Sequence, residues 1–128
     1  MSCTISISDN KDDIWMIRNA IYRWMIEIIK NKYPNEREIS DILLKSSYLG
    51  GISLEMEYQD EPDLTVKIAK VLLTISREIS DGKHTLADDF GKPWPELQDQ
   101  CQASFKELFN ILKRAPFIEE VPNKKLNG

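Results

Sequence analysis

The stretch DNKDDIWMIRNAIYRWMIEIIKNK, residues 9–32, carries the clearest periodic pattern in this chain of 128 residues. Its apolar side chains recur at spacings of three and four, which is the period of one face of an α-helix. Asp12 and Asp13 would lie in the first turn, where the helix dipole favours negative charge, and Pro34 follows the last turn. The pattern predicts a helix from about Asp9 to Lys32 with a broad apolar face. The apolar stripe consists of Ile14, Ile17, Ile21, Trp24 and Ile28, widened by Met25 and Ile29.

Three further segments show a helical period together with start or stop signals. We expect these helices over residues 35–49, 60–81 and 95–114. Glycine follows the first two segments and proline opens the third, and these are the helix positions that the two residues favour. With the first helix, the three segments predict a mainly α fold, a bundle of about four helices.

Residues 52–58 show a different pattern, because apolar and polar side chains alternate there with a period of two. Alternation indicates a half-buried strand, and a lone strand would leave its backbone hydrogen bonds unsatisfied. Residues 3–7 also alternate, so either they or the same segment of a second subunit would supply the partner. The expectation is a short two-stranded β element, although Leu49, Ile52 and Met56 also fit one face of a helix.

Size and composition favour a single globular domain over residues 1–128. Apolar residues make up 41% of the chain and charged residues 30%, which are ordinary values for a protein with a packed core. No repeat, low-complexity tract or linker divides the sequence. The polar end of the chain predicts a mobile C-terminal tail from about residue 117.

The sequence shows no signal for secretion or for membrane insertion. Its N-terminal residues lack a basic region followed by a long apolar run, and no apolar stretch approaches the roughly 20 residues that span a bilayer. Cys3 and Cys101 lie far apart without metal-binding spacing, so neither a disulfide framework nor a zinc site follows. We expect a cytoplasmic protein.

The net charge argues against nucleic acid as a partner. The formal charge is −4 and the sequence pI is near 5.1, whereas binding to phosphates requires clustered Lys and Arg. The surface of the protein is expected to repel nucleic acid.

The one histidine, His84, has Asp88 and Asp89 close to it in the sequence. An imidazole with carboxylates can ligate a metal or transfer protons, so one alternative is a small metal-dependent enzyme or metal-binding protein centred on these residues. The spacing matches no established ligand motif, and acidic residues beside Gly and Pro commonly serve in turns. A solvated loop is therefore the favoured interpretation. No residue set predicts a catalytic site or a cofactor, and Cys101 falls on the apolar face of the last helix.

An acidic segment is the most informative feature for function. Between Lys45 and Lys67 there is no basic residue, and five acidic residues give the segment a local charge of −5. If residues 52–58 form a strand, the first two acids point to one outer face. The segment is either a solvated face with helix-capping acids or a docking surface for a basic partner. The five acids are Glu55, Glu57, Asp60, Glu61 and Asp63.

Trp94 lies between two prolines, Pro93 and Pro95, which hold the chain extended. A tryptophan there either packs under a loop or stands exposed as an anchor for a partner. Packing is the favoured interpretation because tryptophan is usually well buried, and an anchor role stays open.

In size, acidity and lack of a catalytic signature, the chain resembles bacterial immunity and antitoxin proteins, which bind and block a toxic enzyme. The first hypothesis is therefore a non-enzymatic protein-binding module, with inhibition of a basic enzyme such as a nuclease as its specific form. It would dock through the five acids, with Trp94 as a further contact. The metal-binding protein centred on His84 is one alternative, and a homo-oligomeric scaffold is another.

Overall fold

The computed structural model describes residues 2–88 and 90–116. Within them, the first strand begins the described chain, all three strands lie before residue 54, and the elements from that residue on are helices. The strands are β1 (Ser2–Ser6), β2 (Ile14–Arg18) and β3 (Gly51–Ser53), and a 3₁₀ helix, η1 (Lys11–Asp13), precedes β2. The α-helices are α1 (Asn19–Lys32), α2 (Arg37–Ser47), α3 (Leu54–Asp60), α4 (Pro62–Ser80) and α5 (Pro95–Lys113).

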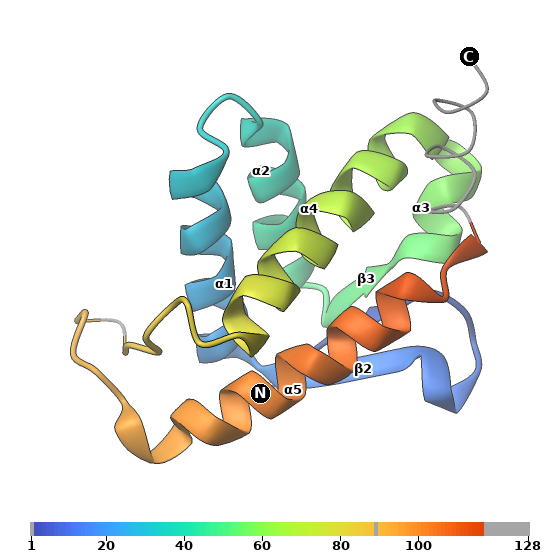
Figure 1. Cartoon of the computed structure of the whole chain (residues 1–128). Coiled ribbons are helices and arrows are strands. Elements are labelled where there is room, and N and C mark those ends of the chain that lie inside the picture. The colour runs from blue at the N-terminus through green and yellow to red at the C-terminus, as the bar shows by residue number, and fades with distance from the viewer. Residues whose placement is uncertain (1, 89, 117–128) are drawn as a thin grey trace.

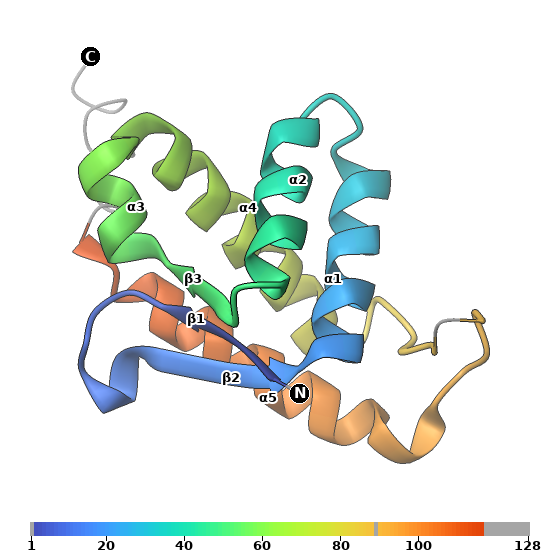
Figure 2. The same ribbon diagram turned by 180° about the vertical axis from the view of Figure 1, so that it is seen from behind.

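The described elements build a small sheet with helices packed around it (Figures 1 and 2). The strand order is β2-β1-β3, with β1 antiparallel to β2 and parallel to β3. Helix α5 packs on α4 and on β2, while α1 and α2 form a pair that rises from one end of the sheet (Figure 2). The prediction of a mainly α fold is confirmed. The four-helix bundle is wrong, because the described chain has five α-helices arranged around three strands.

The predicted first helix is wrong in its N-terminal half, since residues 14–18 form strand β2. In β2 the side chains alternate between exposed and buried, with Trp15 and Ile17 facing the core. Isoleucines at positions 14 and 17 fit a helical spacing, but β-branched and aromatic residues also favour strands. The neighbouring strand β1 supplies a ladder of hydrogen bonds, and the helix begins only at Asn19.

The predicted strand over residues 52–58 is also corrected, because only Gly51–Ser53 is extended and Leu54–Asp60 forms α3. The Ser53 hydroxyl accepts a hydrogen bond from the Met56 N–H and caps this helix. The proposed pairing with residues 3–7 holds for the short strand, since Ile5 lies opposite Ile52. The β element thus has a third strand that the sequence pattern did not reveal.

The other helices agree with the sequence-based prediction to within a few residues. Proline occupies the first turn of both α4 and α5, and α4 ends before Gly82, whose φ of 79° suits a glycine. Each helix buries one apolar stripe. The buried residues of α5 are Cys101, Phe105, Leu108, Ile111 and Leu112, as the spacing predicts.

The core joins the sheet to α5 through an aromatic cluster. The Trp15 and Phe105 rings lie 5.0 Å apart between centroids, and Trp24 meets Phe105 edge-on at 6.3 Å. The Trp15 Nε1–H donates a hydrogen bond of 2.8 Å to the Ser104 carbonyl. Cys101 is a free, buried thiol on the same helix, and burial raises its pKa to about 11. Cys101 is thus a small core side chain, as predicted.

Two further sequence-based expectations concern the C-terminal tail and membrane insertion. The predicted mobile tail from about residue 117 lies outside the described residues. In residues 2–88 and 90–116 no helix has the length and apolar character that a membrane crossing requires.

Candidate interaction surfaces

The five acids of the predicted docking segment lie where α3 turns into α4, and we call them the acidic surface. Four of them are exposed and Glu57 is partly buried. Within the described part of the chain, no ion pair involves any of these five carboxylates. The acidic surface consists of Glu55, Glu57 and Asp60 on α3, Glu61 at the junction and Asp63 in the first turn of α4.

The expected strand face for Glu55 and Glu57 is wrong, because both residues belong to a helix. Residues that are two positions apart in a helix are rotated by about 200° around its axis, so the side chains of Glu55 and Glu57 diverge. Glu55 is exposed while Glu57 is half-buried, in agreement with this geometry. The acids are gathered instead by the sharp connection between α3 and α4, in which Pro62 directly follows Glu61.

Part of the acidic surface also has a local structural role. Glu55, Glu57 and Asp63 lie in first turns of helices, where the helix dipole favours negative charge. The Glu61 carbonyl accepts hydrogen bonds from the N–H and the hydroxyl of Thr65 at 2.9 and 2.8 Å, but its carboxylate caps nothing. These placements explain why acids are tolerated there and leave their side chains facing solvent.

Large apolar side chains are exposed close to the acids in the chain. Met56 lies on α3 between Glu55 and Glu57, and Tyr48 and Leu49 form the turn before β3. Strand β3 has three residues, so it separates this turn from α3 by about 10 Å. An apolar contact beside charged groups is the usual composition of a protein–protein interface.

Trp94 belongs to the connection between α4 and α5, and this connection lies at the end of the molecule opposite to α3 (Figure 1). Its side chain is half-buried against the core, and its backbone N–H donates a hydrogen bond to the Leu86 carbonyl at 2.9 Å. A hollow of about 590 Å³ beside it is lined by Asp88, Lys92 and Glu96 among others. The structure does not bring Trp94 together with the acidic surface.

His84 contacts an acid that the sequence did not single out. Its Nε2 lies 2.9 Å from Glu78 Oε1, and the other Glu78 oxygen accepts a hydrogen bond from Lys32 Nζ. The Lys32 contact is the main reason why the pKa of Glu78 is lowered, and the contact with His84 lowers it further. This arrangement ties the start of the α4–α5 connection to the ends of α1 and α4.

Asp88 is used in a turn. Its Oδ1 accepts hydrogen bonds from the N–H groups of Phe90 and Lys92, both at 2.9 Å. Asp89, the other predicted neighbour of His84, lies outside the described residues. Among the residues that the structure describes, no group of three potential ligands is placed to hold a metal ion.

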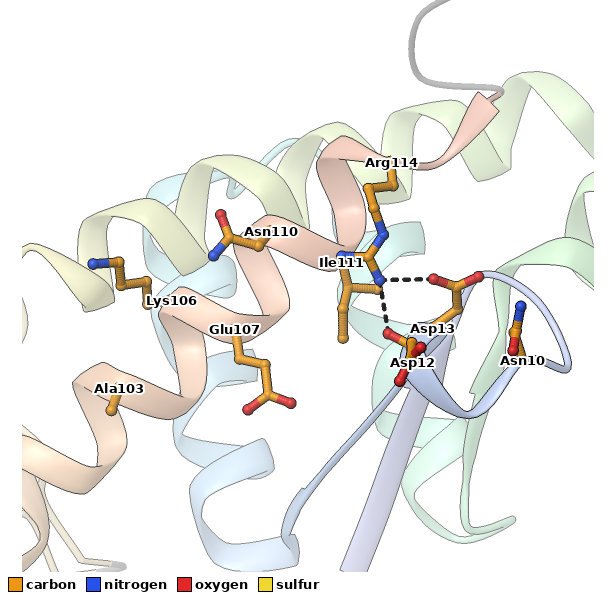
Figure 3. Close-up of a pocket in the computed structure, with 9 residues that line it drawn as sticks. All are labelled: Asn10, Asp12, Asp13, Ala103, Lys106, Glu107, Asn110, Ile111 and Arg114. Carbon is orange, nitrogen blue, oxygen red and sulfur yellow. Dashed lines mark hydrogen bonds and ion pairs between the residues drawn. The ribbon is translucent and has the colours of Figure 1, made fainter.

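Sequence reasoning missed two hollows beside α5, one facing η1 and the other facing β2. The larger, about 810 Å³, lies beside η1 and is crossed by Arg114 (Figure 3). Arg114 Nη2 donates to Asp13 Oδ1 and to the Asp12 carbonyl, each at 2.7 Å. The pKa of Asp13 is lowered by this hydrogen bond and by one from Ser8. The pair fixes the end of α5 to the turn before β2.

The smaller hollow, about 300 Å³, lies at the other end of β2, beside Met16 and Arg18. Its far wall is the N-terminal half of α5, with Leu97 and Ser104. The two hollows thus lie along α5, one beside η1 and the other beside the end of β2. No sequence pattern marks these hollows, because residues 14–17 are all apolar and fit the helix predicted over residues 9–32.

Comparison with known proteins gives no family assignment. The chain matches no protein-family model, and neither a curated protein nor a solved structure is significantly similar to it.

Proposed function

We propose that this chain is a non-enzymatic protein-binding module that docks a basic partner through the acidic surface. The observation that carries the proposal is the gathering of five carboxylates at the α3–α4 connection without an ion pair to any described residue. Exposed carboxylates contribute to the electric field outside the protein. Such a field speeds the approach of a basic surface and disfavours acidic competitors.

Exposed apolar side chains would supply the buried centre of the interface. Met56 projects from α3 among the acids, and charged rim residues contribute mainly to the rate of association and to specificity. Apolar side chains near the centre of an interface usually supply most of the affinity. The α3 face offers both components. Trp94, at the opposite end, would require a second contact and is not part of this interface.

Inhibition of a basic enzyme such as a nuclease is the specific form of this function that we favour. An enzyme that acts on nucleic acid presents Lys and Arg to phosphates, and an acidic surface competes for the same groups. The chain's own charge of −4 suits that role. The likeness to immunity and antitoxin proteins in size and acidity supports this form.

The test compares partner capture by three immobilised proteins from a lysate of the source cell. The first is wild type, and the second carries Glu55→Gln, Glu57→Gln, Asp60→Asn and Glu61→Gln, which remove four charges. The third is a control that removes four exposed charges elsewhere, through Glu27→Gln, Glu38→Gln, Asp41→Asn and Asp99→Asn. Equal circular dichroism spectra would establish that all three are folded.

We expect quantitative mass spectrometry to find a basic protein that wild type and control retain and that the neutralised variant loses. The control has the same net charge as the variant, so a difference between them reports the position of the charges. Equal recovery of every protein on all three would mean that the acidic surface is only a solvated face.

A further inference from the structure

Strand β2 is an open edge of the sheet in the described part of the chain. The Ile7 N–H donates to the Asp13 carbonyl at 3.0 Å, and the ladder continues with Trp15 opposite Ile5. The backbone groups of alternate residues in a strand point to opposite sides. Those of Met16 therefore point away from β1, and no described residue is hydrogen-bonded to them.

This edge lacks the features by which proteins usually prevent association of edge strands. Such features are a very short edge strand, charged residues (above all Lys) or Pro on the edge, a bulge, or a covering segment. The five residues of β2 include neither Lys nor Pro, their one charged residue is Arg18 at the end of the strand, and the register with β1 is continuous. The side chains of Ile14 and Met16 are 39% and 63% exposed on the outer face. An open apolar edge of this kind favours pairing with another strand.

We propose that a second copy of this chain pairs with β2 in antiparallel fashion, about a two-fold axis at Trp15. The outward backbone groups belong to even-numbered residues, so an even-numbered residue must face an even-numbered residue. The register centred on Trp15 places Ile14 opposite the partner's Met16. It also brings Asp12, just before β2, toward the partner's Arg18 at the end of the strand.

Neighbouring registers match the side chains less well. A register centred on Met16 places Ile14 opposite the partner's Arg18 and leaves no basic residue of the partner opposite Asp12. One centred on Ile14 places Met16 opposite the partner's Asp12. Opposite charges and paired apolar side chains stabilise cross-strand contacts, whereas a charge opposite an apolar group does not. The Trp15 register is thus self-complementary, as a two-fold interface requires.

Helix α5 takes part in the same interface. The hydrogen bond from Trp15 to the Ser104 carbonyl places the middle of α5 near the proposed axis. The axis therefore brings α5 antiparallel to the partner's α5. Near this point α5 carries Ala103, a small side chain, and the oppositely charged Lys106 and Glu107, which line the larger hollow (Figure 3). The smaller hollow, beside Met16 and Arg18, gives space for side chains of the second copy.

The test is sedimentation equilibrium of the full chain over a range of concentrations. We expect wild type to approach a mass of twice 14.9 kDa as concentration rises. Asp12→Arg alone and Arg18→Asp alone each place like charges opposite one another twice, and should raise the dimer Kd by about tenfold or more.

An equimolar mixture of the two charge variants should form a heterodimer with Kd near that of wild type. In that mixture the introduced arginine faces the introduced aspartate at one end of the paired strands. At the other end the native Arg18 of one copy faces the native Asp12 of the other, so opposite charges meet at both ends. Arg18→Asp also places a preferred capping residue before α1, so it should not impair folding.

A backbone test separates strand pairing from contact of side chains. Met16→Pro removes an N–H that points away from β1, so β2 keeps its ladder while the intermolecular bond is lost. Met16→Ala retains that N–H and serves as the matched control. We expect the proline variant to raise the dimer Kd by at least tenfold over the alanine variant. A monomeric wild type would overturn the proposal, as would a dimer that neither the charge variants nor Met16→Pro weakens.

Discussion

Trp15→Ala is expected to lower the free energy of unfolding by about 3–5 kcal/mol, the range for truncation of a buried tryptophan or phenylalanine. The Trp15 side chain is 2% exposed and joins the sheet to α5. Its removal leaves a cavity beside Phe105 and removes the donor to the Ser104 carbonyl. Urea denaturation monitored by circular dichroism measures the loss.

The control for this prediction is Tyr48→Ala, which truncates an aromatic side chain that is largely exposed. We expect its free energy of unfolding to change by no more than about 0.5 kcal/mol. A loss below about 1 kcal/mol for Trp15→Ala would contradict the buried strand and favour the helix that the sequence pattern predicts, with Trp15 at the edge of its stripe.

Gly51→Ala should be the second strongly destabilising change, because it combines backbone strain with a collision. Gly51 has a φ of 138°, and a Cβ there would lie 2.2 Å from the Thr4 carbonyl oxygen. Backbone atoms of β1 cannot move aside without breaking the β1–β3 ladder. We expect a loss of at least about 3 kcal/mol in the free energy of unfolding.

Gly50→Ala provides the matched control for Gly51→Ala. Gly50 also has a positive φ, 89°, but a Cβ there meets no atom within 4 Å. Its cost should be the backbone strain alone, about 1–2 kcal/mol. Equal losses for the two variants in urea denaturation would show that the close approach of β1 and β3 contributes nothing.

Helices α4 and α5 could be predicted from the sequence because each has one long apolar stripe and a proline at its start. Strand β2 could not, since Ile14 and Ile17 satisfy a helical spacing and residues 14–17 are apolar throughout, so no alternation of apolar and polar residues marks the segment as a strand. The choice between them is made by β1, a partner in the chain that supplies the hydrogen bonds. A periodic pattern indicates which side chains are buried, but it does not identify the segment that pairs with a strand.

The same reason limits what the sequence reveals of the interaction surfaces. The acidic segment could be found from the sequence because charges are counted along the chain, and this count does not depend on the fold. Their arrangement was predicted wrongly because Ser53 starts a helix within an alternating segment. The hollows beside α5 depend on contacts between residues about 90 positions apart, such as Trp15 and Ser104, and the open edge of β2 depends on which strand pairs with β1 on either side.

The most direct test of the proposed function is the association rate with the captured basic partner, measured by surface plasmon resonance at several salt concentrations. The rate for wild type should fall steeply as salt rises, because screening shortens the reach of the exposed carboxylates. At low salt the variant with neutral residues at 55, 57, 60 and 61 should associate about tenfold more slowly, with a shallower dependence on salt. The control with four charges removed elsewhere should stay close to wild type. A neutralised variant that associates at the wild-type rate and with the wild-type salt dependence would contradict docking through the acidic surface.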